Sequence, residues 1–110
     1  MSVEINTIEE FAFGSPKRGD TVVMAFSGTH LTTAFAAETM YRLVATENCH
    51  VCFSTGTTAT TSDMYMPAGV VEYFTTTDLD TYISVIRNTT NGNLYVTKLT
   101  SARDYLKLGD

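Results

Sequence analysis

The chain has 110 residues, 44% of them hydrophobic and 17% charged, a balance typical of one folded domain rather than a disordered segment. Its formal net charge of -5 repels phosphate backbones, and Lys17-Arg18 is its densest basic cluster, so we expect no nucleic-acid binding. No apolar run approaches the ~20 residues that cross a bilayer, so we expect no membrane partner. The N-terminus lacks the basic-then-apolar order of a signal peptide, which predicts synthesis in a cytoplasm.

The first 20 residues carry the weakest structural signal. Thr7-Ile8-Glu9-Glu10 is typical of a helix start, but Gly14-Ser15-Pro16 would end any helix that begins there. We therefore expect residues 1–20 to form an irregular N-terminal arm and residues 21–110 to form the folded domain.

Strand patterns begin at residue 21. Residues 21–26 are a short apolar run, and residues 41–46 and 49–54 alternate with the period of two that places successive side chains on opposite faces of a strand. Residues 31–43 contain a weak helical stripe, but the β-branched pair Thr32-Thr33 interrupts it. The first half of the domain is therefore expected to consist of strands.

The second half continues in the same way after a polar, threonine-rich loop at 54–62. Met64–Met66 leads into the turn sequence Pro67-Ala68-Gly69, and residues 70–75 and 82–88 have strand composition on either side of a polar connection. Short strands separated by turn signals about every 8–12 residues predict an all-β fold, a small antiparallel β-sandwich of jelly-roll-like form.

The clearest local signal is a final hairpin. Asn91-Gly92 separates 82–88 from 94–99, and both residues tolerate the positive φ that a type I′ turn requires. Apolar residues occur on both faces of 82–88, which predicts a central strand or an oligomer contact. The tail, 101–110, is expected to form one helical turn or to extend.

The pair Cys49 and Cys52 is the first candidate for chemistry. A C-x-x-C pair binds zinc when two further Cys or His ligands complete the tetrahedron, but the chain offers only His30 and His50. Residues 49 and 52 also have opposite parity on a strand, so we expect two reduced structural thiols, no metal and no cofactor. No serine or threonine stands in a recognisable nucleophile motif, and Asp78 and Asp80 lie in a polar loop without calcium-loop spacing. The chain is therefore not expected to be an enzyme.

Aromatic side chains are the remaining candidates for function. The chain has six Tyr, six Phe and no Trp, and for any single residue core packing is the commoner role. Several on strands together would suit a protein interface. The candidate interface residues are Tyr65, Tyr73, Phe74, Tyr82 and Tyr95.

Residues 39–99 contain short motifs in a characteristic order. They are the strand pair 40–45 and 48–54, the loop Ala59-Thr60-Thr61-Ser62-Asp63, the turn 66–74 with Pro67-Ala68-Gly69 and Glu72, and the last strand Gly92-Asn93-Leu94-Tyr95-Val96-Thr97. In this order they resemble the small β-sandwich structural proteins of tailed-bacteriophage virions. The resemblance covers rather more than half of the chain and leaves the first 35 residues aside.

The resemblance implies a virion component without an active site, made in the host cytoplasm. A capsid decoration (cement) protein that binds the capsid or another virion protein as a homo-oligomer, a dimer or trimer, is the leading expectation. A tail or head-fibre component is also compatible. The alternative is a carbohydrate-binding or adhesion module that uses Tyr65, Tyr73 and Tyr95 for stacking.

Overall fold

The computed structural model describes residues 15–56 and 58–100, and side chains within 20–56 and 58–99. Eight strands occupy these ranges: β1 (Ser15–Phe26), β2 (Leu31–Ala34), β3 (Met40–Ala45), β4 (Cys49–Ser54), β5 (Met64–Met66), β6 (Glu72–Thr75), β7 (Tyr82–Arg87) and β8 (Gly92–Thr100). The described residues contain no helix, and so none that could span a membrane. The expected all-β class is confirmed.

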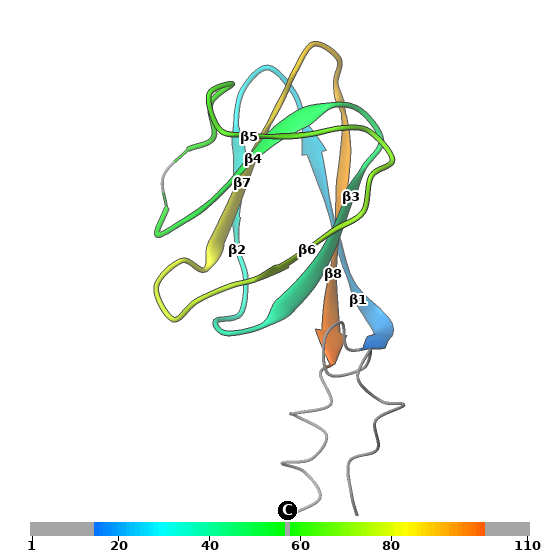
Figure 1. Cartoon of the computed structure of the whole chain (residues 1–110), viewed down its shortest axis with the longest axis vertical. Coiled ribbons are helices and arrows are strands. Elements are labelled where there is room, and N and C mark those ends of the chain that lie inside the picture. The colour runs from blue at the N-terminus through cyan, green and yellow to red at the C-terminus, as the bar shows by residue number, and fades with distance from the viewer. Residues whose placement is uncertain (1–14, 57, 101–110) are drawn as a thin grey trace, which may run out of the picture.

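The strands form two antiparallel four-stranded sheets that pack face to face (Figure 1). Sheet A has the order β1-β8-β3-β6, and sheet B has the order β2-β7-β4-β5. Consecutive strands therefore mostly alternate between sheets, which is the connectivity of an eight-stranded jelly roll. The expected jelly-roll-like sandwich is present.

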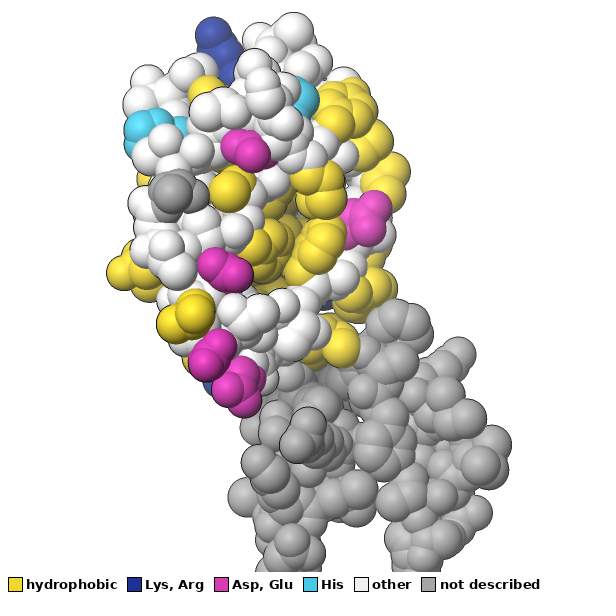
Figure 2. Space-filling model, turned by 60° about the vertical axis from the view of Figure 1, so that its left-hand side comes forward, with side chains coloured by type: hydrophobic (Ala, Val, Ile, Leu, Met, Phe, Trp, Pro, Cys, Tyr) yellow, Lys and Arg dark blue, Asp and Glu magenta, His cyan; other side chains and the backbone are white. Residues whose placement is uncertain are grey.

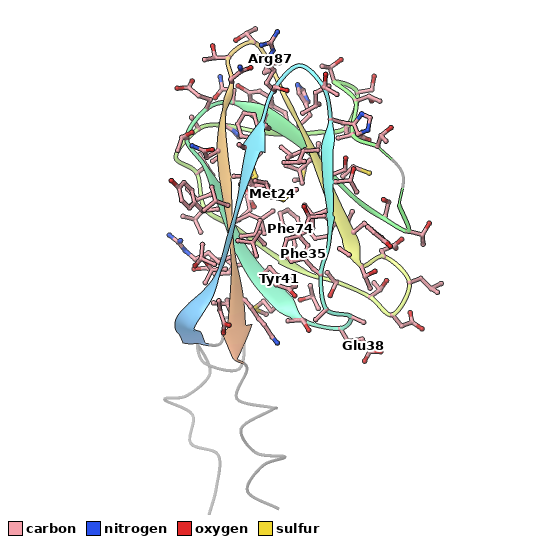
Figure 3. The ribbon with its side chains drawn as sticks, turned by 180° about the vertical axis from the view of Figure 1, so that it is seen from behind. Met24, Phe35, Glu38, Tyr41, Phe74 and Arg87 are labelled. Carbon is pink, nitrogen blue, oxygen red and sulfur yellow. The ribbon has the colours of Figure 1, made fainter. Side chains whose placement is uncertain are left out.

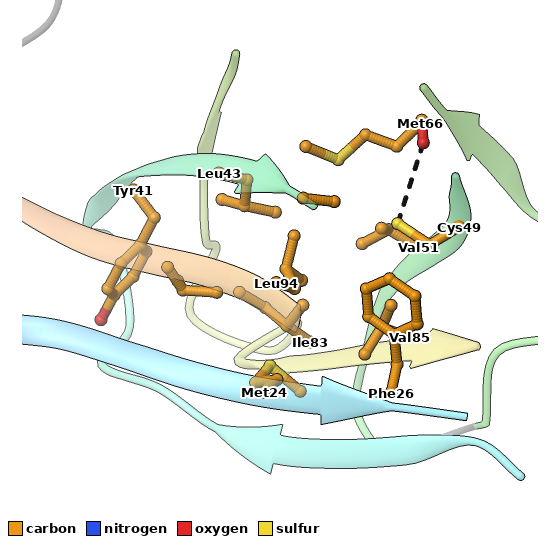
Figure 4. Packing of buried hydrophobic residues seen from close by; sticks show 12 residues of the cluster. Met24, Phe26, Tyr41, Leu43, Cys49, Val51, Met66, Ile83, Val85 and Leu94 are labelled. Atoms are coloured by element: carbon orange, nitrogen blue, oxygen red, sulfur yellow. Dashed lines mark hydrogen bonds between the residues drawn. The ribbon is translucent and has the colours of Figure 1, made fainter. Parts of the chain in front are cut away.

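Period-two alternation places one apolar row of each strand between the sheets. In β3 every second residue, from Tyr41 to Ala45, is buried, and in β7 Ile83 and Val85 are fully buried. Met24, Tyr41 and Phe74 of sheet A point into the same space as Phe35, which directly follows β2 (Figure 3). Each fully buried aliphatic side chain contributes roughly 1.5–3 kcal/mol. The core cluster consists of Met24, Phe26, Tyr41, Leu43, Ala45, Cys49, Val51, Met66, Ile83, Val85, Leu94 and Val96 (Figure 4).

The predicted final hairpin is wrong. β7 pairs with β2 and β4 in sheet B, whereas β8 pairs with β1 and β3 in sheet A, so the chain crosses between the sheets at residues 88–91. Among the described residues only Glu38, Gly56 and Gly69 have positive φ, which excludes a type I′ turn at Asn91-Gly92. The expectation that 82–88 is a central strand is confirmed, because β7 has a neighbour on each side.

Position 92 requires glycine because a Cβ atom has no room there, and not because its φ angle is positive. A Cβ atom there would lie 2.9 Å from Cζ of Phe26 and 2.9 Å from Cβ of Glu47. Where the chain crosses between the sheets, the backbone of Gly92 thus packs directly against the end of β1 and the β3–β4 turn. This close approach explains why the sequence has glycine at a position that resembles a hairpin turn.

The first two strands differ from the expectations. β1 begins at Ser15, inside the range expected to be an arm, and residues 17–20 stand opposite the single residue 98 in a bulge. β2, at 31–34, was not predicted, because four residues with a polar centre give little periodicity. The expected helix start at 7–10 and the tail at 101–110 lie outside the described residues.

Candidate functional site: the outer face of sheet A

The outer face of sheet B is partly covered by the chain itself. In the connection 55–63, between β4 and β5, the described residue Ala59 lies on this face, and its amide donates a 2.8 Å hydrogen bond to Oγ of Ser84. The hydroxyl of Thr32 donates a second 2.8 Å hydrogen bond to the same oxygen. Ser84 is fully buried although it faces away from the core, and Ala59 is 3% exposed. This connection therefore covers the part of sheet B around Ser84, whereas Tyr65 on β5 remains 48% exposed.

His50 belongs to the same covering layer. Its Nδ1 lies 3.0 Å from the carbonyl oxygen of Asp63, and its Nε2 lies 3.0 Å from Oδ1 of Asn88. A neutral imidazole carries a single N–H, so the tautomer decides which of these two contacts the ring donates. The Tyr65 ring lies 5.5 Å from the imidazole, centroid to centroid. His50 on β4 thus has a structural role, because its ring contacts both Asp63 in the 55–63 connection and Asn88 directly after β7.

The outer face of sheet A is different, because an apolar row crosses it. Tyr95 of β8 is the register partner of both Val23 of β1 and Val44 of β3. Val71 lies one residue beyond the Leu43–Glu72 pair, which places it next to Val44. Val23 is 52% exposed, and Val71 and Tyr95 are each 37% exposed. Within the described residues, no loop covers this row in the way that 55–63 covers sheet B.

Polar side chains flank the row on the same face. Thr21 and Thr97 share a 2.9 Å hydrogen bond between their Oγ1 atoms. Arg42 is the register partner of Thr97 on one side and of Tyr73 on the other. The face therefore combines an apolar stripe with threonine hydroxyls and a cation, the mixture found at protein interfaces. We call the set Val23, Arg42, Val44, Val71, Tyr73 and Tyr95 the sheet A face.

The five aromatic residues proposed from the sequence do not form one surface. Tyr73 and Tyr95 lie on the sheet A face, whereas Tyr65 and Tyr82 have the outward parity of sheet B, opposite His50 and Ser54. Phe74 has the inward parity of β6 and packs against the core. A stacking platform built from Tyr65 together with Tyr73 and Tyr95 is therefore divided between opposite sides of the sandwich.

The valines of the sheet A face were not among those candidates. Val44 shares its parity with Arg42 and Thr46, the set that faces away from the core. A β-branched apolar residue among outward polar ones is a signal of an exposed apolar patch. Val23 gave no such signal, since the apolar run 21–26 does not reveal which parity faces the core.

The two thiols lie on opposite faces of β4, as their parity predicts. Cys49 is fully buried, and its Sγ lies 3.9 Å from the carbonyl oxygen of Met66 (Figure 4). Burial raises the pKa of this thiol to about 11. Cys52 is half-buried, with its Sγ 3.8 Å from the carbonyl oxygen of Phe53. The pair therefore cannot act as two ligands of one ion.

Tyr41 shows the same effect of burial as Cys49. Its hydroxyl accepts a 3.0 Å hydrogen bond from the amide of Ala36. Desolvation raises the pKa of Tyr41, the Ala36 hydrogen bond opposes the shift, and the charge of Asp20 reinforces it. Cys49 and Tyr41, whose pKa values are both raised, are thus core residues rather than members of a site.

No group of three or more His, Cys, Asp or Glu side chains within 15–56 and 58–100 is arranged to hold a metal ion. No protein-family model, curated protein or solved structure matches the chain.

Proposed function

We propose that this chain is a non-catalytic structural protein of a bacteriophage virion, most specifically a capsid decoration protein that attaches through the sheet A face and acts as a homo-oligomer. The observation that carries the proposal is the partly exposed apolar row in which Tyr95 pairs with Val23 and Val44, with Val71 just beyond the end of β6. An exposed apolar row of this length on an otherwise acidic domain is typical of a protein contact.

The size of this face supports attachment by many copies. Four strands about 4.8 Å apart and about six residues long cover roughly 400 Å² in projection. A standard protein interface buries about 800 Å² of accessible surface on each partner. A single contact is therefore expected to be weak, and linking two or three copies raises the overall avidity without any new contact. A homo-oligomer on a repeating lattice meets this requirement.

Two of the residues that the sequence offered for chemistry have structural partners, which also supports a binding role. His50 is held by Asp63 and Asn88, and Cys49 is buried against Met66. The fold is compatible, because eight-stranded jelly rolls occur in viral capsid proteins and in lectins. Because one fold serves many functions, the sheet A face supports the binding role more strongly than the fold does.

Two measurements test the proposal. Light scattering on purified protein, with metal analysis of the same sample, should give a metal-free dimer or trimer. A monomer with about one zinc ion per chain would contradict both the oligomer and the structural role of the thiols. The chain should also co-sediment with particles of the virus whose genome encodes it, and its failure to do so would exclude a decoration role.

A carbohydrate-binding module is the second candidate, favoured by Tyr73 and Tyr95 on one open face. Tyrosine rings on a flat sheet stack on sugar rings. A glycan array separates the two functions, because a decoration protein should bind no glycan, whereas a lectin should lose its ligand when Tyr95 is replaced.

A further inference from the structure

The sandwich is open along one side, between β6 of sheet A and the second half of β4 in sheet B. β5 has three residues and pairs with Cys49–Val51 only, so the edge strand of sheet B ends before Phe53. β6 is the edge strand of sheet A on the same side. The space-filling view shows a hollow there with hydrophobic side chains inside it (Figure 2).

Two phenylalanines lie at this open side, one on β4 and one on β6. Phe53 is the register partner of the fully buried Ile83, and Phe74 is the register partner of the buried Tyr41, so both rings have inward parity. Their centroids are 5.1 Å apart with the planes tilted by 44°. Both side chains remain partly exposed although they pack against the core. They thus offer aromatic surface at the mouth of an apolar hollow.

A carboxylate lies on the same strand face as one of these rings. Glu72 precedes Phe74 by two residues on β6 and is the register partner of Leu43, which is fully buried. Its side chain therefore has the inward parity of an apolar position, and it is half-buried. Asp and Glu side chains also surround the hollow in the space-filling view (Figure 2). The opening is apolar inside and acidic at its rim.

We propose that this opening, the β4–β6 cleft formed by Phe53, Phe74 and Glu72, binds a small organic cation with an apolar body, such as an aryl- or alkylammonium ion. The apolar body fills the hollow, and the ammonium group lies near the phenylalanine rings and the Glu72 carboxylate. Aromatic faces attract cations through their quadrupole, and a carboxylate adds direct charge attraction. The net charge of -5 favours the approach of a cation over that of an anion.

This site is separate from the proposed attachment surface. Tyr73, between Glu72 and Phe74, has the opposite parity and belongs to the sheet A face. The cleft therefore opens beside that face without using its side chains. Loss of capsid binding would leave the proposal intact, and loss of cation binding would leave the decoration role intact.

The test is an NMR titration of the full chain with three matched probes: phenethylammonium, 2-phenylethanol and phenylacetate. A ligand of this size is expected to bind with a dissociation constant on the order of 1 mM. Phenethylammonium should shift the backbone amides of Phe53, Phe74 and their neighbours in a saturable way. The neutral alcohol should bind at least fivefold more weakly, and the anion should cause no saturable shift.

Variants locate the two parts of the site. Glu72→Gln should weaken phenethylammonium binding at least threefold and leave 2-phenylethanol binding unchanged, whereas Glu47→Gln, at the β3–β4 turn, should change neither. Phe53→Leu keeps an apolar side chain and should weaken the ammonium probe more than the alcohol. Equal binding of all three probes, or shifts that map to the sheet A face, would overturn the proposal, as would the absence of saturable binding by the ammonium probe.

Discussion

The hydroxyl of Thr32 donates a 2.8 Å hydrogen bond to the hydroxyl of Ser84, its register partner on the neighbouring strand. Because the Ala59 amide donates to the same oxygen, this pair fastens the 55–63 segment to sheet B. Ser84 thus holds part of the covering over the outer face of sheet B.

Ser84→Ala should lower the free energy of unfolding by about 1–3 kcal/mol, because it leaves the buried Ala59 N–H without an acceptor. The Ala59 amide should also exchange with deuterium faster than in the parent protein. Urea denaturation and hydrogen exchange measure the two effects. The control is Thr32→Val, which removes one donor and leaves the Ala59 bond in place, so unchanged exchange at Ala59 is expected there. Equal exchange in both variants and the parent would contradict the role of Ser84.

Tyr95→Ser should abolish co-sedimentation with virus particles. Cross-strand pairs of this kind contribute roughly 0.2–1 kcal/mol, so the free energy of unfolding should fall by no more than about 1 kcal/mol. The matched control is Leu79→Ser, because Leu79 is 69% exposed and lies in the β6–β7 connection, away from the sheet A face. If both variants sediment like the parent, another surface makes the attachment.

The two thiols should react at very different rates in the native protein. Cys52 is half-buried and should be modified by a thiol reagent within minutes, whereas the fully buried Cys49 should react only after unfolding. Mass spectrometry of the labelled protein identifies the modified residue. Rapid double labelling without denaturant would mean that the β4–β5 edge opens readily.

Stability should fall at high pH. The pKa of Cys49 is raised from 9.0 to about 11 by burial, so the folded state keeps a proton that the unfolded state loses. The protonated Cys49 thiol therefore makes its full contribution to the free energy of unfolding below pH 9. This contribution disappears as the pH rises to about 11, a loss on the order of 2–3 kcal/mol. The raised pKa of Tyr41 acts in the same direction at higher pH.

Urea denaturation at several pH values between 8 and 10.5 measures this loss. Cys49→Ala should flatten the dependence in this window, and Cys52→Ala should leave it as steep as in the parent. If the free energy of unfolding depends on pH equally in all three proteins, groups other than Cys49 dominate that dependence.

Gly92→Ala should destabilise the protein by about 1–3 kcal/mol, because its Cβ would overlap Phe26 and Glu47. Gly69 serves as the comparison. Its φ of 79° strains any other residue, but no atom lies within 4 Å of an added Cβ, so Gly69→Ala should cost about 1 kcal/mol. Thermal unfolding of both variants ranks the two effects. A smaller loss at Gly92 than at Gly69 would contradict the close packing at the crossing.

Alternation predicted which residues face the core wherever a strand had one apolar parity. Tyr41, Leu43 and Ala45 are buried as a set, and so are Ile83 and Val85. The partner of each strand could not be predicted in this way. A turn sequence such as Asn91-Gly92 indicates where the chain changes direction, but the choice between a hairpin and a crossing depends on which strands already occupy both edges of β7.

The candidate surface was only partly predictable. Tyr73 and Tyr95 were identified from strand positions, but exposure of the sheet A face also depends on how Ala59 docks on Ser84, far from β8 in the sequence. A sequence pattern shows which parity faces outward, whereas the covering of an outward face results from tertiary packing.

The pairing of the first and last strands has a mechanical consequence. Ser15 and Thr100 are register partners, so both ends of the described chain leave from one corner of the sandwich (Figure 1). The hydrogen bonds of an antiparallel pair run across the strands. A pulling force applied to the two termini would therefore load these hydrogen bonds one at a time and unzip β1 from β8, beginning at the Ser15–Thr100 pair. The force required would be much lower than for shearing the two strands lengthwise.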